Sequence, residues 1–251
     1  MNPPRAFLCL ALSLTMLVRV ASAASVTLNP IHDTFVSSAN PTSNYGAAGA
    51  LLIDSSKLSK GEFDSLLQFD LSSAKSSFDT AFGAGQWTIS SITLQLFNAN
   101  PMNPLFNSAA AGLFTLNWMP NDSWVEGTGT PATPTTDGIT YNTLPGFLSA
   151  SDESLGVFSF NGATTGSNTW SLNLTTNFLA DATGGNVVSM VGLPDDSVVS
   201  YTTNSENFTT STSRPVLTVT AQAVPEPAAV GFLAIGAMTL LGRRSRRTVA
   251  A

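Results

Sequence analysis

The segment Ser91-Ile92-Thr93-Leu94-Gln95-Leu96 alternates strictly between polar and apolar side chains. Successive side chains of a β-strand point to opposite faces, so Ile92, Leu94 and Leu96 share one face and the polar residues share the other. The segment therefore predicts a half-buried strand, with one face against a core and the other toward solvent.

Short apolar segments of this kind recur along the chain between clusters of Ser, Thr, Asn and Gly, which is typical of an all-β sandwich or barrel. One helix is expected at residues 175–182, where Thr175 or Thr176 can cap its start and Gly184-Gly185 can end it. Residues 98–111 and 127–138 are expected to be loops. The expected strands are 26–28, 34–37, 51–54, 63–69, 86–97, 112–117, 155–160, 168–174, 187–191, 198–202 and 215–220.

The charges of the chain are divided unevenly between its ends and its body. The two ends hold six of the 10 basic residues and one of the 16 acidic residues, which leaves four basic and 15 acidic residues in the body, a net charge of −11. Such a body does not suit nucleic acid, whose phosphates are bound by Lys and Arg. It is compatible with neutral glycans and with calcium, and it would repel anionic polymers unless a cation bridges them.

The N-terminus has the pattern of a secretory signal peptide. Arg5 precedes an apolar run at residues 7–18, and Ala21-Ser22-Ala23 offers small residues for cleavage. We expect residues 1–23 to be removed and residues 24–223 to form one domain. Cys9 is the single cysteine and lies in the apolar run, so the mature protein would have no disulfide.

The C-terminus combines three features within residues 224–247. Pro225, Glu226 and Pro227 form a stiff motif, an uncharged apolar run follows at residues 228–241, and a basic cluster closes the tail: Arg243, Arg244, Arg246 and Arg247. The apolar run is short for a membrane span, which needs about 20 residues. A core helix is the alternative, but four arginines at one end favour a short membrane-inserted helix with the body outside.

This tail resembles a PEP-CTERM sorting signal, because the three features stand in that order at the end of the chain. The resemblance implies recognition of the Pro-Glu-Pro motif by an exosortase-type membrane protease, transient membrane insertion, and delivery to the surface of a Gram-negative bacterium. It also implies an association with exopolysaccharide.

The body resembles a DNRLRE-type domain, through a series of segments in the same order. This resemblance implies a jelly-roll β-sandwich of the carbohydrate-binding-module kind, and some relatives of this type bind acidic polysaccharides. The chain departs from the family pattern at Gln68, where a basic residue is usual, and at residues 127–138, which form an insertion. The matching segments are His32-Asp33-Thr34-Phe35-Val36, Asn44-Tyr45-Gly46, Leu51-Leu52-Ile53, Leu66 to Ser72, Ile89 to Phe97, Trp124-Val125-Glu126, Ile139-Thr140-Tyr141-Asn142, Trp170 to Thr175 and Arg214-Pro215-Val216-Leu217.

The sequence offers little for catalysis. His32 is the single histidine, and no G-x-S-x-G motif accompanies it. The adjacent carboxylates Asp195 and Asp196 follow a proline and read as a solvated turn, although two distant carboxylates could still meet in space. We therefore expect a protein that is not an enzyme.

Two kinds of binding site are expected. Asp33 and Asp70 are candidate ligands of a structural calcium ion, with the alternative that Asp33 caps a turn and Asp70 bonds the backbone of residues 71–72. Tyr45, Trp118 and Tyr141 are candidates for stacking on sugar rings, with packing in the core as the alternative. The remaining tryptophans, Trp87, Trp124 and Trp170, are expected in the core.

Three functions follow from these features. The first is an exported, surface-sorted, non-enzymatic protein that acts in the extracellular matrix or binds carbohydrate. The second is a secreted enzyme that degrades polysaccharide, which a cleft with converging carboxylates would favour. The third is a purely structural surface protein that assembles without a ligand.

Overall fold

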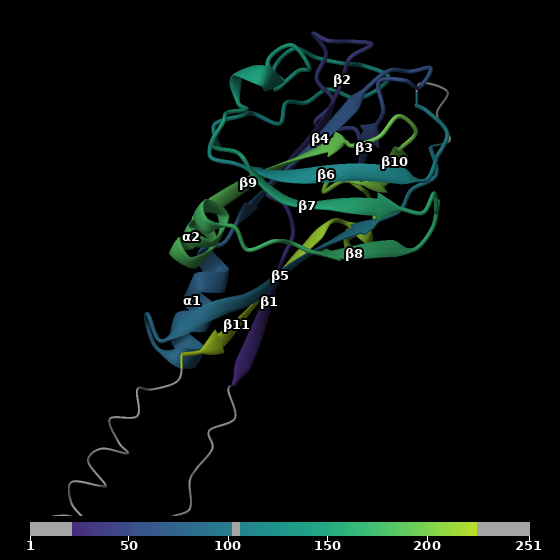
Figure 1. The fold of residues 1–251 in the computed structure, drawn as a ribbon. Coiled ribbons are helices and arrows are strands. Elements are labelled where there is room, and N and C mark those ends of the chain that lie inside the picture. Colours follow the sequence, from purple (N-terminus) through teal and green to yellow (C-terminus); the bar gives the residue numbers. More distant parts are fainter. Residues whose placement is uncertain (1–21, 102–105, 225–251) are drawn as a thin grey trace, which may run out of the picture.

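The computed structural model describes residues 22–101 and 106–224, which form a two-sheet β-sandwich (Figure 1). The predicted signal peptide and the sorting tail, including the expected membrane helix, lie outside the described residues. No helix within the described residues is long and apolar enough to cross a membrane.

One sheet has four antiparallel strands, in the order β1 (Ala23–Leu28), β11 (Val216–Ala223), β5 (Trp87–Phe97) and β8 (Ser167–Ser171). The other sheet has seven strands, and β2 joins it by pairing with β4. Its strands are β10 (Ser200–Asn204), β3 (Ala50–Asp54), β4 (Phe63–Asp70), β9 (Val187–Pro194), β6 (Gly112–Met119), β7 (Glu153–Phe160) and β2 (His32–Ser37). The predicted all-β sandwich is confirmed, and each expected strand overlaps an observed one.

The alternating segment of the sequence lies in β5, where Ile92, Leu94 and Leu96 are buried between the sheets. Trp87 and Ile89 are buried on the same face as these three residues. Strict alternation would place them on the opposite face, because their numbers are odd and the other three are even. The register between β5 and β11 shifts there, since Thr220 lies opposite Ser91 and Ala221 lies opposite Ile89. Ser90 is thus the extra residue of a β-bulge, which keeps both halves of the long strand facing the core.

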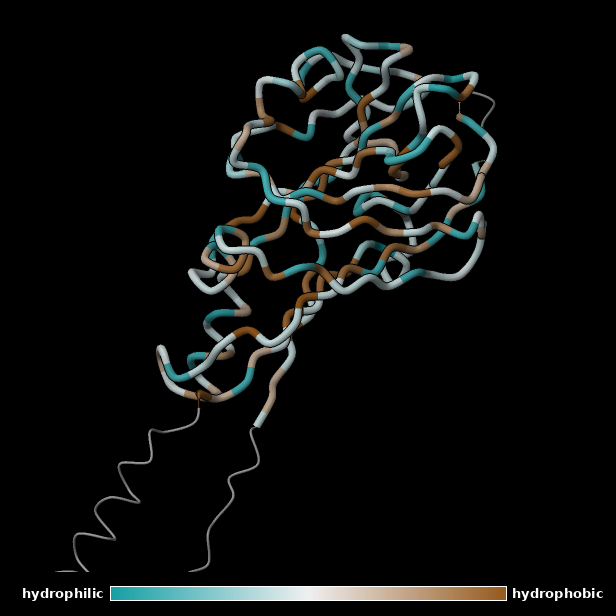
Figure 2. Tube along the Cα trace, in the orientation of Figure 1, coloured by the Kyte–Doolittle hydropathy of each residue, from teal (hydrophilic) through white to brown (hydrophobic). Residues whose placement is uncertain are grey.

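The hydropathy of the chain follows this layering, because apolar segments cluster along the strands and polar ones along the loops (Figure 2). The main core fills the space between the sheets with aromatic and aliphatic side chains, including Phe69, Phe114 and Tyr201. A second cluster, with Leu66 and Trp124, lies on the other face of β4, and a third surrounds Phe35 and Tyr45.

Within the described residues, two α-helices connect strands. The expected helix is observed as α2 (Thr176–Gly184), with Thr175 at its N-cap position and Gly185 at φ 71° ending it. The other, α1 (Ser72–Phe82), was not predicted from the sequence, because its five serines and threonines weaken the helical pattern. It forms because Ala74 and Phe78 are buried and because Trp87 Nε1 donates to Asp79 Oδ1 at 2.8 Å.

Candidate functional site

Several of the motif segments of the body meet at one end of the sandwich. In Figure 1 the loops after β2 and after β6 gather at the top, whereas β1 begins and β11 ends at the opposite pole. The Asn44-Tyr45-Gly46 turn, the Trp124-Val125-Glu126 segment and the chain after β10 are joined there by hydrogen bonds.

Asn44 is the centre of this arrangement, since its buried side chain makes four hydrogen bonds. Its Nδ2 donates to the carbonyl oxygens of Glu126 at 2.6 Å and Ile139 at 2.9 Å. Its Oδ1 accepts from the backbone N–H groups of Gly46 at 3.0 Å and Gly129 at 3.3 Å. One amide therefore fixes the turn that carries Tyr45 against the loop after β6.

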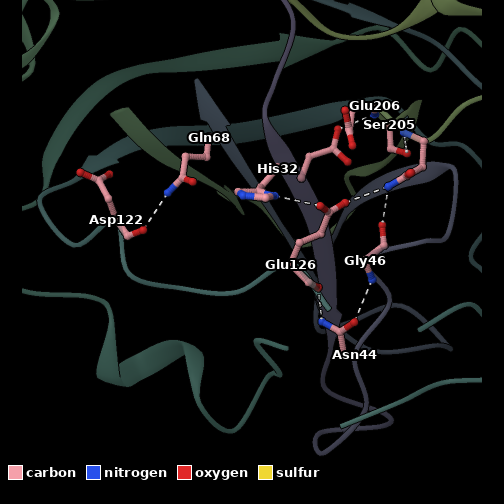
Figure 3. A network of polar contacts seen from close by, with 10 residues as sticks. His32, Asn44, Gly46, Gln68, Asp122, Glu126, Ser205 and Glu206 are labelled. Atoms are coloured by element: carbon pink, nitrogen blue, oxygen red, sulfur yellow. Dashed lines mark hydrogen bonds and ion pairs between the residues drawn. The ribbon is translucent and has the colours of Figure 1, made fainter. Parts of the chain in front are cut away.

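Glu126 extends the network through its carboxylate (Figure 3). Its two oxygens accept from His32 Nδ1 at 3.1 Å and from Asn207 Nδ2 at 2.8 Å. Asn207 Nδ2 also donates to the carbonyl of Gly46 at 2.9 Å. Burial raises the pKa of Glu126, and the hydrogen bond from His32 partly opposes that rise. His32 thus has Glu126 as its partner in this network.

Gln68 occupies the position where a basic residue was expected from the resemblance. Its amide is buried, and Nε2 donates to the carbonyl of Asp122 at 2.8 Å (Figure 3). The same Nε2 donates to Ser189 Oγ at 3.0 Å. Trp124 Nε1 donates to the same Ser189 hydroxyl at 3.0 Å. Gln68 therefore anchors the loop after β6 to the sheet and adds no positive charge there.

Beside the Asn44 turn lies a cavity of about 350 Å³, at the lower end of the ~300–1,000 Å³ that is usual for small-molecule sites. Four aromatic rings form its apolar part. Phe35 and Tyr45 stack with centroids 4.6 Å apart, and Phe106 stands edge-on to Phe35 at 5.8 Å. We call this space the aromatic cavity; its lining residues are Phe35, Ala39, Asn40, Tyr45, Lys60, Phe63, Phe106, Pro131 and Pro134.

The rim of the aromatic cavity is exposed to solvent. Ala39, Asn40 and Pro134 are exposed, so the cavity opens to solvent on their side. Lys60 and Phe106 come from different loops that Asn107 connects, because its Oδ1 accepts from the Lys60 N–H at 3.0 Å and its Nδ2 donates to Asp54 Oδ2 at 2.8 Å. Burial raises the pKa of Asp54 to about 6.

The structure separates the three aromatic residues expected to bind sugar. Tyr45 lines the aromatic cavity and is 6% exposed. Trp118 is 4% exposed and packs within the main core, which is the expected alternative. The alternation of β6 turns Trp118 inward together with Leu116. Tyr141 is half-buried against the cluster of Leu66 and Trp124, away from the residues that line the cavity.

The two aspartates expected to bind calcium do not form one site. Asp33 is fully buried opposite Leu67, and its Oδ2 accepts from the Glu206 N–H at 2.6 Å while Oδ1 has no partner among the described residues. Burial raises the pKa of Asp33. Asp70 is exposed at the end of β4 and accepts from the Ser72 N–H at 2.9 Å, which is the expected alternative.

No group of three or more His, Cys, Asp or Glu side chains is arranged to hold a metal ion within residues 22–101 and 106–224. Calcium binding as such stays a prediction. Trp87 and Trp124 are buried in the core as expected, and Trp170 is half-buried against Tyr201 and Phe114.

Most residues of the aromatic cavity were missed from the sequence. Phe35 and Phe63 lie in strands, where the sequence pattern predicts that an aromatic side chain packs in the core. Phe106 and Lys60 lie in loops that have no recognisable motif. The insertion at residues 127–138 contributes Pro131 and Pro134 and pairs with the Asn44 turn through Asn44 and Thr135. Two signals were present, the Asn-Tyr-Gly turn and the Pro-containing insertion, but they stand far apart in the sequence.

A comparison with protein-family models matches residues 24–222 to the model described as carbohydrate-binding module family 96. A search of curated proteins finds no match.

Proposed function

We propose, from the premise that this chain belongs to carbohydrate-binding module family 96, that it is an exported, non-enzymatic protein whose β-sandwich binds polysaccharide in the aromatic cavity. The family supports binding of carbohydrate rather than its chemical conversion. The observation that carries the location is the lining of the cavity, where the half-buried ring of Phe106 accompanies the polar groups of Asn40, Tyr45 and Lys60. Sugar rings present apolar C–H faces and hydroxyl edges, which fit such a lining.

The distribution of carboxylates supports a binder over a polysaccharide-degrading enzyme. Glycoside hydrolysis uses two carboxyl groups that face each other across the sugar bond, about 5–10 Å apart. None of the described residues that line the aromatic cavity carries a carboxylate. The nearby carboxylates of Asp33 and Glu126 are occupied with backbone and side-chain hydrogen bonds that hold the loops.

The ends of the chain support export and surface delivery as part of the proposal. The signal-peptide pattern at residues 1–23 would direct the chain out of the cytoplasm, and an exosortase-type protease would recognise Pro225, Glu226 and Pro227. On this proposal the body acts in an extracellular matrix that contains exopolysaccharide. A purely structural surface protein is the alternative.

Affinity electrophoresis of the purified protein, in gels that contain neutral or acidic polysaccharides, tests this proposal. We expect retardation in at least one gel, lost in Phe106→Ala and Tyr45→Ala and kept in Val157→Ala. Val157 is 55% exposed on β7 and does not line the cavity, so it is the matched control. Absence of retardation in every gel, with the protein folded, would favour the structural alternative.

A further inference from the structure

We infer that the aromatic cavity accepts an uncharged sugar unit, so that the ligand is a neutral polysaccharide rather than a polyuronate. This inference rests on the proposed function and names the ligand class of the same cavity. It follows from the charges on and around the cavity, which the family assignment does not specify.

The lining itself is almost free of charge. Phe106 provides the half-buried aromatic ring, whereas Phe35 and Phe63 are 0% and 4% exposed and lie beneath the surface. Asn40 and the Tyr45 hydroxyl can exchange hydrogen bonds with sugar hydroxyls. Lys60 is the one charged residue among the described residues of the lining. A repeating uronate brings a negative charge on every unit, and one half-buried lysine can offset only one of them.

The other three cations of the body do not line the cavity. Lys75 pairs with Asp79 on α1, and Arg214 Nε donates to the carbonyl of Phe208 at 3.0 Å. Lys57 is exposed in the loop between β3 and β4 and is absent from the lining. No second basic side chain is therefore available, within the described residues, to extend a cationic track along a polymer.

The body as a whole is negative. It carries 15 acidic residues against four basic ones. Such a field lowers the local concentration of a polyanion and leaves that of a neutral polymer unchanged. A neutral sugar loses no charge solvation when it enters an apolar cavity, whereas a carboxylate does.

The test is isothermal titration of the purified protein with neutral hexasaccharides (gluco-, manno- and xylo-series) and with hexamannuronate and hexagalacturonate. We expect a neutral series to bind, with a Kd that changes less than about twofold between ~20 and ~200 mM NaCl, because no charges are paired. Phe106→Ala should weaken binding about tenfold or more through loss of one aromatic face. Lys60→Gln should change the Kd less than about threefold, since its amide keeps a hydrogen-bond donor.

The outcomes separate the two proposals. Tighter binding of a uronate, lost in Lys60→Gln or weakened by salt, would overturn the inference and leave carbohydrate binding intact. Uronate binding that requires calcium and disappears with chelator would overturn it as well, because a bridging cation would then supply the charge. If no sugar binds, or if Phe106→Ala binds as the wild type does, the proposed function of the cavity fails together with the inference.

Discussion

The side chain of Asn44 donates a 2.6 Å hydrogen bond to the carbonyl of Glu126, 82 residues later in the chain. This contact joins the turn after β2 to the loop after β6, and the same amide satisfies three further backbone groups. The loop end of the sandwich is consequently held by one fully bonded polar side chain rather than by apolar packing alone.

Replacement of this side chain should be costly. Asn44→Ala leaves two carbonyls and two N–H groups without their partner, and each buried unsatisfied group costs about 1–3 kcal/mol. We expect a loss of about 3 kcal/mol in the free energy of unfolding, measured by urea denaturation. Asn121→Ala is the control, because Asn121 bonds only the exposed Ser123 among the described residues. Equal effects of both variants would contradict the central role of Asn44.

Gly46 should not tolerate a side chain. A Cβ at this position would lie 2.3 Å from the carbonyl oxygen of Glu126 and 2.4 Å from that of Gly127, and both obstacles are backbone atoms. We expect Gly46→Ala to lower the melting temperature and to weaken sugar binding, because the turn must move and Tyr45 moves with it. Gly146→Ala is the matched control, since a Cβ there meets nothing within 4 Å. A Gly46→Ala protein as stable as the Gly146→Ala protein would show that the turn is free to shift.

Asp64 should make the fold less stable as the pH rises. Its carboxyl group is 2% exposed, Oδ1 has no partner among the described residues, and burial raises the pKa to about 8, with Glu62 adding to the rise. The protonated form is therefore favoured by folding. Its contribution is fully present below the unfolded pKa near 4 and is lost as the pH rises toward 8, by at most about 1.4 kcal/mol per pH unit.

Urea denaturation at intervals between pH 4 and pH 8 measures this effect. The free energy of unfolding of the wild type should fall relative to that of Asp64→Asn as the pH rises. Asp70 is the control of opposite sign, because the backbone N–H of Ser72 lowers its pKa and its contribution is lost as the pH falls. Parallel curves for the wild type and Asp64→Asn would mean that Asp64 ionises freely in the folded protein.

The bulge in β5 should be needed only because Ser90 is present. Without Ser90, the buried residues Trp87, Ile89, Ile92, Leu94 and Leu96 would follow the alternation of a regular strand, so they would still face the core. We expect deletion of Ser90 to leave the protein folded, whereas deletion of Thr93, where the register is regular, should turn one half of the strand out of the core and lower the melting temperature strongly. Ser90→Ala keeps the residue count and loses only a 3.2 Å bond to the carbonyl of Thr220, so it should remain near the wild type.

The strands could be predicted from the sequence because alternation reports directly on a half-buried surface. Ile92, Leu94 and Leu96 were placed on the correct face by that rule alone. Alternation alone cannot predict the β-bulge at Ser90, because the bulge depends on pairing with the partner strand β11. Helix α1 was missed for a related reason, since its stability comes from Phe78 and Trp87 meeting in space at 5.1 Å rather than from local propensity.

The candidate site was harder to predict, because each of its aromatic rings could either line a cavity or fill the core. Only the packing of the folded chain decides between these two positions. Tyr45 and Trp118 both follow family-like or strand-like patterns, yet one lines a cavity and the other fills the core. Phe106 and Pro131 come from segments without a periodic pattern. Their convergence is set by Asn107 and Asn44, whose hydrogen bonds link loops that are distant in sequence.

The pairing of β1 with β11 has a mechanical consequence. Ala23 lies opposite Gln222, and the Ala223 N–H donates to the carbonyl of Ser22 at 3.2 Å, so the first and last strands meet at their free ends. Tension between these two ends would pull the antiparallel strands apart like a zipper, one hydrogen bond at a time and beginning at Ala23. A domain pulled by one end alone, against a ligand held at the loop end, would instead load the whole length of β11 in shear against β5, where many bonds must break together.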